Sequence, residues 1–423
     1  MADLGHTVIA LDADAAKVES LAAGRPPIFE PGLDELLARA LASGRLRFTT
    51  DYAELVGADV HFVCVGTPQL RGDNAADTSY VFSAARSLAP QLTSQALVVG
   101  KSTVPVGTAA RFREQLQAGA PEGVRARLAW NPEFLREGFA IRDTVAPDRF
   151  VYGVDGPDAE ADVALLDQVY AAGLATGTPR IVADYPTAEL VKVAANAFLA
   201  TKISFINAMS EVCEAAGGDV VQLADALGHD PRIGRRFLNA GVGFGGGCLP
   251  KDIRAFMARA GELGADEALT FLREVDAINM RRRTRMVEIA REQCNGTLMG
   301  KRVTVLGAAF KPDSDDTRDS PALSVAAQVR LQGAHVTVHD PQAMANARRA
   351  WPDLSYAETA MDAVAGAHVI LHLTEWSEYR ELDPVAVGAV AAVKRIVDGR
   401  NALDGQRWRD AGWTYRALGR PQL

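Results

Sequence analysis

Apolar residues from Thr7 to about Asp184 fall into short runs that are separated by longer amphipathic stretches. The runs that predict buried strands are HTVIALD, DVHFVCVG, ALVVGKS, RLAWNPE and DRFVYGV. Strands that alternate with helices indicate a parallel sheet with helices on both faces. Ligands of such sheets bind beyond the carboxyl ends of the strands. We therefore expect the chemistry in the polar turns GTP, KSTVPVGT and NPEFLREGF.

The segment from Thr187 to about Gly217 has a different pattern. It contains no proline, and its first glycine comes at its end. Seven of its positions follow one another at steps of three or four residues, as residues on one face of a long helix do. They are Leu190, Val193, Ala197, Thr201, Phe205, Ala208 and Val212. Because a long helix between two sheet domains often forms an interface, we expect a homodimer through this helix. Further helices are predicted in GDVVQLADALG, DIRAFMARAGELG and NMRRRTRMVEIA.

A second α/β pattern begins near Lys301. The segments KRVTVLGAAF, AHVTVHD, AHVILHLTEW and VKRIVDGRN predict strands, and SPALSVAAQVRLQG predicts a helix opened by Ser-Pro. The predicted fold class is α/β, with two doubly wound Rossmann-like domains joined by a central helical domain that contains the long helix. The expected domains are residues 1–185, 186–295 and 296–423.

Length and composition limit the class of protein. The chain has 423 residues, enough for two or three domains, and its apolar (48%) and charged (23%) fractions are those of an ordinary globular protein. A net charge of −8 argues against nucleic acid as a partner. The four cysteines form no CxxC pair, so we expect no metal site and a reducing compartment. No targeting segment or apolar run long enough for a membrane is present, which predicts a cytoplasmic protein without a membrane partner.

The two α/β patterns can be compared with each other. The segments LGHTVIALD and QGAHVTVHD have the same form, and each ends in an acid, Asp12 or Asp340. A strand, a loop and a helix precede the second copy, whereas only Met1 to Leu4 precede the first copy. A carboxylate that closes this strand is typical of dinucleotide-binding units, where it holds the ribose hydroxyls and favours NAD over NADP. By this comparison, we expect the first domain to lack the strand and the phosphate-binding glycine loop that should precede Asp12.

The most specific motif is RIGRRFLNAGVGFGGGCLPKD, from Arg232 to Asp252. Its glycines let the backbone curl closely around a ligand and lead directly to Cys248. A nearby cation such as Lys251 would favour the thiolate, which is the nucleophilic form of cysteine. A flexible linker that ends in a buried cysteine is the structural alternative.

These motifs resemble the UDP-glucose/GDP-mannose dehydrogenase family, a group of nucleotide-sugar dehydrogenases. The resemblance extends over essentially the whole chain and also includes CVGTP, KSTVPVGT, NPEFLREG, ELVKVAANAFLATKISFINA and FKPDSDDTRDS in the expected order. It implies an NAD-binding first domain, a central helical domain with a catalytic cysteine and a UDP-sugar-binding third domain. The implied reaction is the NAD-dependent oxidation of a sugar primary alcohol to a carboxylate, with UDP-glucose as the substrate and UDP-glucuronate as the product.

The resemblance assigns catalytic roles to six residues. Cys248 would hold the sugar as a thiohemiacetal and then as a thioester. Lys192 and Asn196, four residues apart on the long helix, would stabilise the developing alkoxide. Asp252 would help Lys192 to orient water, although it could also be the N-cap of the following helix. The remaining two are Glu133, which would guide the hydrolytic water, and Thr103, which would meet the nicotinamide ribose or a water.

The resemblance also assigns contacts with the two ligands. The cofactor residues are Asp12, Lys17, Thr67, Thr103, Glu137, Lys251 and Arg318. The substrate residues are Glu133, Phe134, Leu135, Arg136, Glu137, Lys192, Asn196, Arg232, Phe237, Leu238, Asn239, Ala240, Gly241, Gly245, Lys311 and Arg400. Arg232 would reach across the dimer interface. Taken singly, the cations are typical surface residues, and Glu133 and Glu137 could instead interact with a helix dipole.

Two alternatives remain open at this point. The substrate could be another nucleotide sugar, such as GDP-mannose or UDP-N-acetylmannosamine. The chain could also be a catalytically impaired nucleotide-sugar binder, because the family's GxGxxG loop is matched nowhere in these residues. The simplest hypothesis for that difference is a start codon assigned too late, with Met1 an internal residue of the first helix. A polypeptide that truly starts at Met1 is expected to bind NAD weakly.

Overall fold

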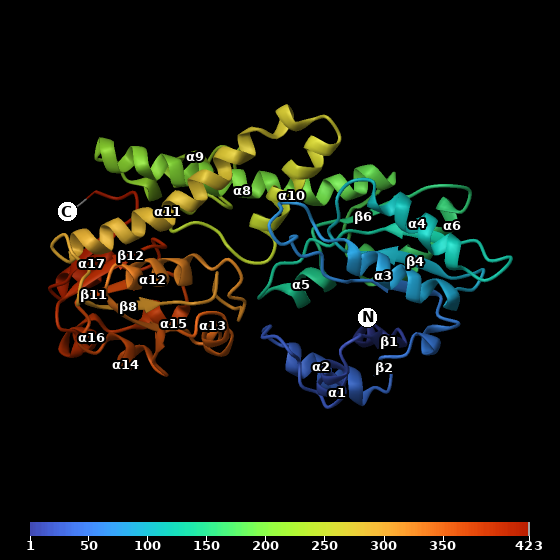
Figure 1. Ribbon diagram of the computed structural model, residues 1–423, viewed down its shortest axis with the longest axis horizontal. Helices are drawn as coiled ribbons and strands as arrows, with labels where there is room; N and C mark the ends of the chain where they lie inside the picture. The colour runs from blue at the N-terminus through green and yellow to red at the C-terminus, as the bar shows by residue number, and fades with distance from the viewer. Residues whose placement is uncertain (422–423) are drawn as a thin grey trace. The chain divides into compact units, whose positions relative to one another are not determined.

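The computed structural model describes residues 1–421 and divides them into two compact units (Figure 1). The first unit contains Met1–Ala195 and Arg254–Gly264, and the second contains Asn196–Ile253 and Ala265–Leu423. Two of the three boundaries fall inside helices, α8 (Tyr185–Ala216) and α10 (Leu249–Glu262), and the third follows the end of α10. The long helix predicted from the apolar spacing is confirmed as α8.

The first unit is built on a sheet of five strands in the order β3-β4-β5-β6-β7. These strands are β3 (Val60–Val63), β4 (Leu97–Gly100), β5 (Arg127–Trp130), β6 (Phe150–Val154) and β7 (Arg180–Ala183). A separate parallel pair, β1 (Val8–Leu11) and β2 (Leu46–Thr49), lies with α1 (Ala15–Ala22) and α2 (Leu33–Ala42). The remaining helices are α3 (Ser79–Leu88), α4 (Thr108–Gly119), α5 (Ala140–Val145), α6 (Ala159–Val169) and α7 (Ala171–Ala175).

The expected parallel sheet is wrong at one pair of strands. Strands β5 and β6 are antiparallel, with Trp130 opposite Gly153, while the other neighbouring strands are parallel. After β5 the chain enters β6 at the same end of the sheet at which β5 finishes. No crossover connection is therefore needed, and β6 runs in the opposite direction. The sequence runs identified both strands but carried no signal for their relative direction.

The five-stranded sheet has an apolar layer on each face. One layer contains Val98, Phe112 and Trp130, and the other contains Val99 and Tyr152. The alternation of Val98 and Val99 between the layers follows the two-residue period of a strand. Such a sheet is buried on both faces, which fixes the positions of its strand ends.

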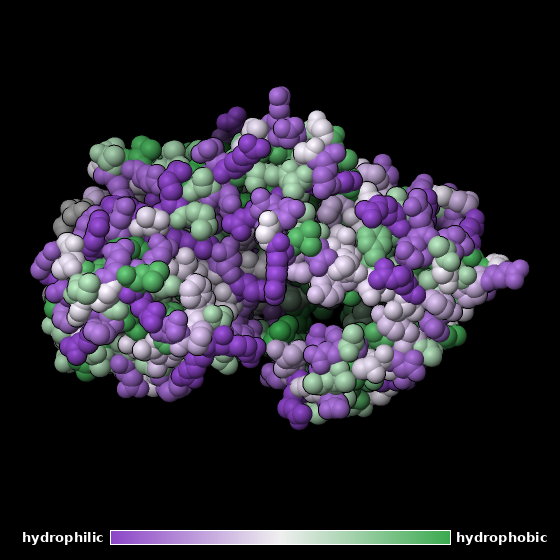
Figure 2. Space-filling view, in the orientation of Figure 1, coloured by the Kyte–Doolittle hydropathy of each residue, from purple (hydrophilic) through white to green (hydrophobic). Residues whose placement is uncertain are grey.

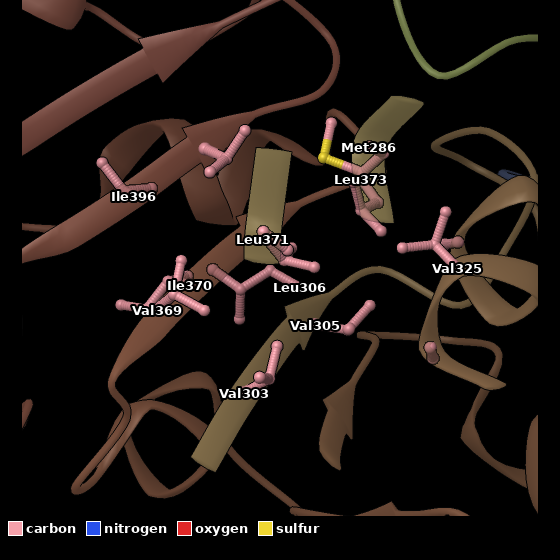
Figure 3. Close-up of a cluster of buried hydrophobic side chains, with 14 of the residues drawn as sticks. Met286, Val303, Val305, Leu306, Val325, Val369, Ile370, Leu371, Leu373 and Ile396 are labelled. Atoms are coloured by element: carbon pink, nitrogen blue, oxygen red, sulfur yellow. The ribbon is translucent and has the colours of Figure 1, made fainter. Parts of the chain in front are cut away.

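The second unit contains a sheet of six parallel strands in the order β10-β9-β8-β11-β12-β13. They are β8 (Arg302–Leu306), β9 (His335–His339), β10 (Ser355–Tyr356), β11 (Val369–His372), β12 (Arg395–Asp398) and β13 (Thr414–Ala417). The sequence analysis predicted four of these strands but missed β10 and β13, and it also missed β2 and β7. Figure 3 shows how Val303, Val305, Ile370, Leu371 and Ile396 fill the core of this sheet, with Met286 contributed by a helix.

Within the described residues, the second unit contains eight further helices, most of which pack on this sheet, while α9 packs on α8. They are α9 (Val220–Gly228), α11 (Phe271–Gln293), α12 (Pro321–Leu331), α13 (Met344–Ala350), α14 (Ala360–Val364), α15 (Ser377–Glu381), α16 (Pro384–Val390) and α17 (Gly405–Asp410). The predicted Ser-Pro start of α12 is confirmed, because Ser320 accepts a hydrogen bond from the Leu323 backbone. Short 3-10 turns, η1 (Ala2–Leu4), η2 (Tyr52–Leu55), η3 (Ala89–Gln91) and η4 (Asp266–Leu269), complete the described elements.

The apolar face predicted for α8 is only partly buried. Val193 and Ala197 are buried, whereas Phe205 and Val212 are 47% and 56% exposed. Phe198, seven residues before Phe205, is 67% exposed. Hydrophilic side chains cover much of the surface seen in Figure 2, so a row of exposed apolar side chains on one helix is a distinct feature.

Candidate active site

Hydrogen bonds organise the loops at the carboxyl ends of β3 and β4. Ser102 donates to the carbonyl of Val65, and Thr67 donates to the carbonyl of Thr103, each over 2.7 Å. The loop after β3 and the loop after β4 therefore hold each other. This arrangement brings the predicted residues Thr67 and Thr103 together at the edge where ligands of parallel sheets bind.

Lys101 lies beside this edge without a carboxylate at hydrogen-bond distance among the described contacts. Its Nζ donates to the side-chain oxygen of Asn131 over 3.1 Å and to the hydroxyl of Tyr170 over 3.3 Å. Burial lowers the pKa of Lys101, and the negative groups near it oppose that shift. Asn131 opens the NPEFLREG segment, so Lys101 helps to fix the start of that segment.

The α4 helix is capped by a residue that the sequence analysis did not select. Glu189 of α8 is 2% exposed, and its two oxygens accept the backbone N–H groups of Gly107 (2.7 Å) and Ala109 (2.6 Å). Burial raises the pKa of Glu189, and these backbone hydrogen bonds partly offset the rise. Arg259 of α10 also donates to the carbonyl of Val106 over 2.9 Å. These bonds anchor the end of the loop that carries Thr103.

Lys192 stands three residues after Glu189 on the same face of α8. Its Nζ lies 3.2 Å from the Oε1 of Glu133 and 5.6 Å from the ring centre of Phe134. Lys192 is buried, and Glu133 is partly exposed. The structure therefore brings together a predicted catalytic lysine and a predicted catalytic carboxylate.

The helix-dipole alternative for Glu133 and Glu137 is wrong. The helix after this segment, α5, begins at Ala140, so neither glutamate lies in its first turn. The acid at its start is Glu30, which accepts the backbone N–H groups of Gly138 and Ala140, each over 2.7 Å. Glu133 instead accepts a hydrogen bond from the backbone of Leu135, in an irregular segment.

Among the described contacts, other side chains of the NPEFLREG segment do not meet Glu133 but have their own surroundings. Leu135 is exposed, and Phe134 lies under the guanidinium of Arg149 at 3.8 Å. Arg136 pairs with Asp143 through two side-chain hydrogen bonds of 2.6 and 2.8 Å. This guanidinium holds the pKa of Asp143 below its ordinary value.

Asp12 and Lys17 form an ion pair of 2.5 Å at the carboxyl end of β1. The backbone N–H of Asp12 donates to Thr49 of β2, and its carboxylate lies at the start of α1, whose N-cap is Asp14. Both Asp12 and Lys17 remain partly exposed. The carboxylate is therefore accessible to hydroxyl groups of a ligand.

In the second unit, the glycine loop (Gly241–Gly247) is pressed against two other loops. A Cβ on Gly241 would lie 2.7 Å from the carbonyl of Gly399, and one on Gly245 would lie 2.3 Å from the carbonyl of Asp319. The backbone N–H of Val242 donates to Gly399 over 2.8 Å. These close approaches explain the run of glycines, since side chains would separate the loops.

Cys248 occupies the N-cap of α10, and its side chain is exposed. Its carbonyl accepts the N–H of Asp252 over 2.9 Å, the first hydrogen bond of the helix. Asp252 therefore lies inside the first turn, so its alternative assignment as the N-cap is wrong. The helix starts earlier than expected because Leu249 and Pro250 adopt helical geometry, which proline favours at a helix start.

Asp252 links two other predicted residues. Its Oδ2 accepts the side-chain amide of Asn196 over 2.6 Å, and its Oδ1 accepts the ammonium of Lys251 over 2.5 Å. Asn196 and Asp252 are both buried. The structure therefore brings Asn196 of α8 to Lys251 and Asp252, which lie within one turn of Cys248 along α10.

The FLNAG segment precedes the glycine loop. Phe237 has a φ of 65°, a left-handed conformation that bulky residues rarely adopt. Leu238 and Ala240 are buried, and the side-chain oxygen of Asn239 accepts a hydrogen bond from Arg235. Strained backbone of this kind is concentrated at ligand-binding sites.

Besides Lys251, four predicted cations of the second unit have different surroundings. Arg400 donates to the carbonyls of Leu373, Gly243 and Phe310, so it supports the glycine loop. Lys311 lies 5.5 Å from the ring centre of Phe310. Arg318 pairs with Asp316 and lies against Gly247. Arg232 is exposed and pairs with Asp230.

Comparisons with known proteins identify the family. Residues 1–173 match the NAD binding domain of the UDP-glucose/GDP-mannose dehydrogenase family, residues 186–281 match its central domain, and residues 304–405 match its UDP binding domain. The chain belongs to this family. Family membership confirms NAD as the cofactor and the two Rossmann-like domains with a central helical region.

Individual relatives agree with this assignment. A UDP-glucose 6-dehydrogenase of Rhizobium meliloti (strain 1021) is 42% identical over 421 residues, which cover 99% of this chain and 95% of the relative. The structure of a UDP-glucose dehydrogenase from Pyrobaculum islandicum has a TM-score of 0.90 and 39% identity, and the match covers 99% of this chain and 93% of that one. A UDP-D-MAnNAc dehydrogenase structure from Pyrococcus horikoshii has a TM-score of 0.86 and 27% identity, with 100% and 96% of the two chains covered.

Two residues of the first unit escaped the sequence analysis. Glu189 and Glu30 each cap a helix that lies far from them in the sequence, by 80 and 110 residues to the bonded alanines. An acid on the same helical face as Lys192 was a usable signal for Glu189. Within residues 1–421, no helix is long and apolar enough to cross a membrane.

Proposed function

We propose that this chain oxidises the C6 alcohol of UDP-glucose to the carboxylate of UDP-glucuronate in two NAD-dependent steps. The observation that carries the proposal is Cys248 at the N-cap of α10, next to the Asn196–Asp252–Lys251 cluster, in a chain with a UDP-glucose 6-dehydrogenase relative of 42% identity. A helix N-terminus favours a thiolate, which is the form that attacks an aldehyde.

The residues around Asp12 fit the adenosine ribose of NAD. Its carboxylate is accessible at the carboxyl end of a parallel strand, and a carboxylate there binds ribose hydroxyls. Thr67, Thr103, Glu137, Lys251 and Arg318 are proposed as further contacts with NAD. When bound, NAD supplies the hydride acceptor for both oxidations.

The side chains of this protein are proposed to hold the carbon that is oxidised. The first oxidation removes a hydride from C6 and a proton from its hydroxyl, which leaves an aldehyde. The Cys248 sulfur then bonds to the aldehyde carbon, and the oxygen takes up a proton to give a thiohemiacetal. A covalent bond retains the aldehyde between the two oxidations.

The second oxidation removes a hydride from that carbon and a proton from its oxygen, so a thioester forms on Cys248. Water then adds to the thioester carbon, and the carbon–sulfur bond breaks. The products are the carboxylate, the regenerated thiolate and two protons. We propose that Lys192 and Asn196 stabilise the negative oxygen, while Glu133, Asp252 and Thr103 orient water.

The substrate is proposed to contact Glu133 to Glu137, Phe237 to Gly241, Gly245, Lys311 and Arg400. Cations such as Lys311 would offset the charge of the diphosphate in a chain with a net charge of −8. The three-part division at residues 185 and 295 and a cytoplasmic location also stand as proposals.

We further propose a homodimer through α8. Phe198, Phe205 and Val212 recur every seven residues and are exposed by 47% or more, so they form one apolar row along the helix. Arg232 is exposed, as expected if it acts in the partner's site. Replacing Phe198 and Phe205 with glutamate should convert the dimer to a monomer in light scattering, and an unchanged mass would contradict this interface.

The function is tested by following NADH production with UDP-glucose and with GDP-mannose. We expect UDP-glucose to be preferred and C248A to stop UDP-glucuronate formation. The matched control is C64A, since Cys64 is also exposed but lies in the first unit. A preference for GDP-mannose, or UDP-glucuronate formation by C248A at the wild-type rate, would contradict the proposal.

A further inference from the structure

The backbone of the glycine loop is held mainly by side chains and by neighbouring loops. Asn207 accepts the N–H of Gly241 over 2.8 Å, Arg282 donates to the carbonyl of Gly241 over 3.2 Å, and Arg400 donates to the carbonyl of Gly243 over 2.8 Å. Buried backbone groups need such partners when no helix or strand supplies them. The course of the loop is therefore set by the side chains that meet its backbone.

Asn279 of α11 makes the most complete of these contacts. Its Oδ1 accepts the N–H of Phe244 over 2.8 Å, and its Nδ2 donates to the carbonyl of Phe244 over 3.0 Å. Asn279 is fully buried, so water does not compete for these bonds. One carboxamide thus satisfies both backbone groups of a residue, as a neighbouring strand would.

The residue before Phe244 is adapted to this contact. Gly243 has a φ of 97°, and a Cβ there would lie 2.4 Å from the Oδ1 of Asn279. A side chain at this position would both strain the backbone and displace the carboxamide. The contact between Asn279 and Phe244 therefore requires glycine at position 243.

The rest of the loop has little freedom between Phe244 and Cys248. A Cβ on Gly246 would meet the ring of Phe310 at 2.8 Å, and one on Gly247 would meet the guanidinium of Arg318 at 2.3 Å. Gly246 also donates its N–H to the carbonyl of Arg318 over 2.9 Å. A shift of the backbone at Phe244 is consequently passed along to Cys248.

We propose that Asn279 is a positioning residue that fixes the place of the Cys248 sulfur through the backbone of Phe244. This inference rests on the proposed covalent role of Cys248. Asn279 itself touches neither ligand in this role. Its loss leaves the thiol present but displaced, so that the aldehyde is captured less efficiently after the first oxidation.

The test is N279D, which preserves the size of the side chain but replaces the N–H donor with a second oxygen. That oxygen would face the carbonyl of Phe244 without a proton between them. The matched control is S204A, which removes the buried hydrogen bond of 2.7 Å from Ser204 of α8 to the carbonyl of Val275 of α11. This control weakens the packing of α11 against α8 without touching the glycine loop.

The readout is the ratio of NADH to UDP-glucuronate with a hydrazine present to trap free aldehyde. Complete oxidation gives a ratio of two, and each aldehyde that escapes adds one NADH without product. For N279D we expect a ratio clearly above two and UDP-glucuronate formation about 10- to 100-fold slower. S204A should keep a ratio of two, even if it lowers the melting temperature.

Each other outcome has a definite meaning. A ratio of two for N279D, together with loss of UDP-glucuronate formation in C248A, overturns the positioning role alone. Wild-type behaviour of C248A overturns the proposed function on which the inference rests. If N279D does not fold, N279S replaces it, because serine fits the space and can reach just one of the two backbone groups.

Discussion

Asn196 donates its side-chain amide to Asp252 over 2.6 Å, and both residues are buried. The other oxygen of Asp252 accepts the ammonium of Lys251 over 2.5 Å. The carboxylate therefore fixes which way the amide of Asn196 points and holds a cation beside it. Asp252 is therefore the residue that connects Asn196 and Lys251 in the polar cluster near Cys248.

We expect D252N to lower kcat for UDP-glucose by about 100-fold, because the amide of Asn196 and the ammonium of Lys251 lose their common anion. KM should change much less, since the substitution removes no proposed contact with the sugar nucleotide. Steady-state kinetics of D252N measure both effects. D155N is the control, as Asp155 pairs with Arg113 on an exposed surface of the first unit, and equal losses in both variants would contradict the prediction.

Local periodicity was sufficient to predict the long helix and most of the strands. The spacing of Leu190, Val193 and Ala197 predicted α8, because a helix repeats its face every three to four residues. Strands such as β4 and β11 were predicted because both of their faces are buried, which makes their sequences continuously apolar. The missed strand β7 has mainly exposed residues, so its sequence lacked that signal.

Relationships between distant residues could not be predicted in the same way. The antiparallel pairing of β5 and β6 depends on the path of the chain between them, which apolar spacing does not encode. Glu30 and Glu189 cap helices that are remote in sequence, and a carboxylate gives no sign of which backbone it will meet. By contrast, the sequence alone indicated a site at Cys248, because the glycines, the thiol and the cation Lys251 are close together in the chain.

Glu189 provides a test of such a remote cap. In E189Q an amide N–H₂ replaces one oxygen and faces either the N–H of Gly107 or that of Ala109. We expect the free energy of unfolding to fall by about 1–3 kcal/mol, since a buried donor is left without a partner. Denaturant unfolding measures this change. E114Q on the exposed side of α4 should change stability little, and an equally stable E189Q would refute the capping role.

The backbone at Phe237 provides a second test. Its φ of 65° is strained for phenylalanine but is readily adopted by asparagine and glycine. Since the Phe237 side chain is 37% exposed, F237N loses only part of its burial. We expect F237N to unfold at equal or higher denaturant concentration, with a gain of up to about 1 kcal/mol. A clear loss of stability would show that contacts of the ring outweigh the strain.

His61 leads to a prediction about pH. It lies in β3, is 6% exposed, and its Nε2 has no hydrogen-bond partner among the described residues. Burial lowers the pKa of His61 below its ordinary value of 6.5. The folded protein therefore keeps the imidazole neutral, whereas the unfolded chain binds a proton as the pH falls below about 6.5. Stability is lost through that window, by about 1.4 kcal/mol for each unit of pKa difference.

We accordingly expect H61L to lose less stability than the wild type between pH 7 and pH 5.5, because leucine takes up no proton in either state. Melting temperatures measured across this range give the two slopes. H335Q is the control for the loss of a histidine from a strand, since His335 is exposed in β9. If H61L lost as much stability as the wild type between pH 7 and pH 5.5, His61 would not be the cause of that loss. Other buried histidines would then account for it, such as His339, whose pKa is also lowered by burial.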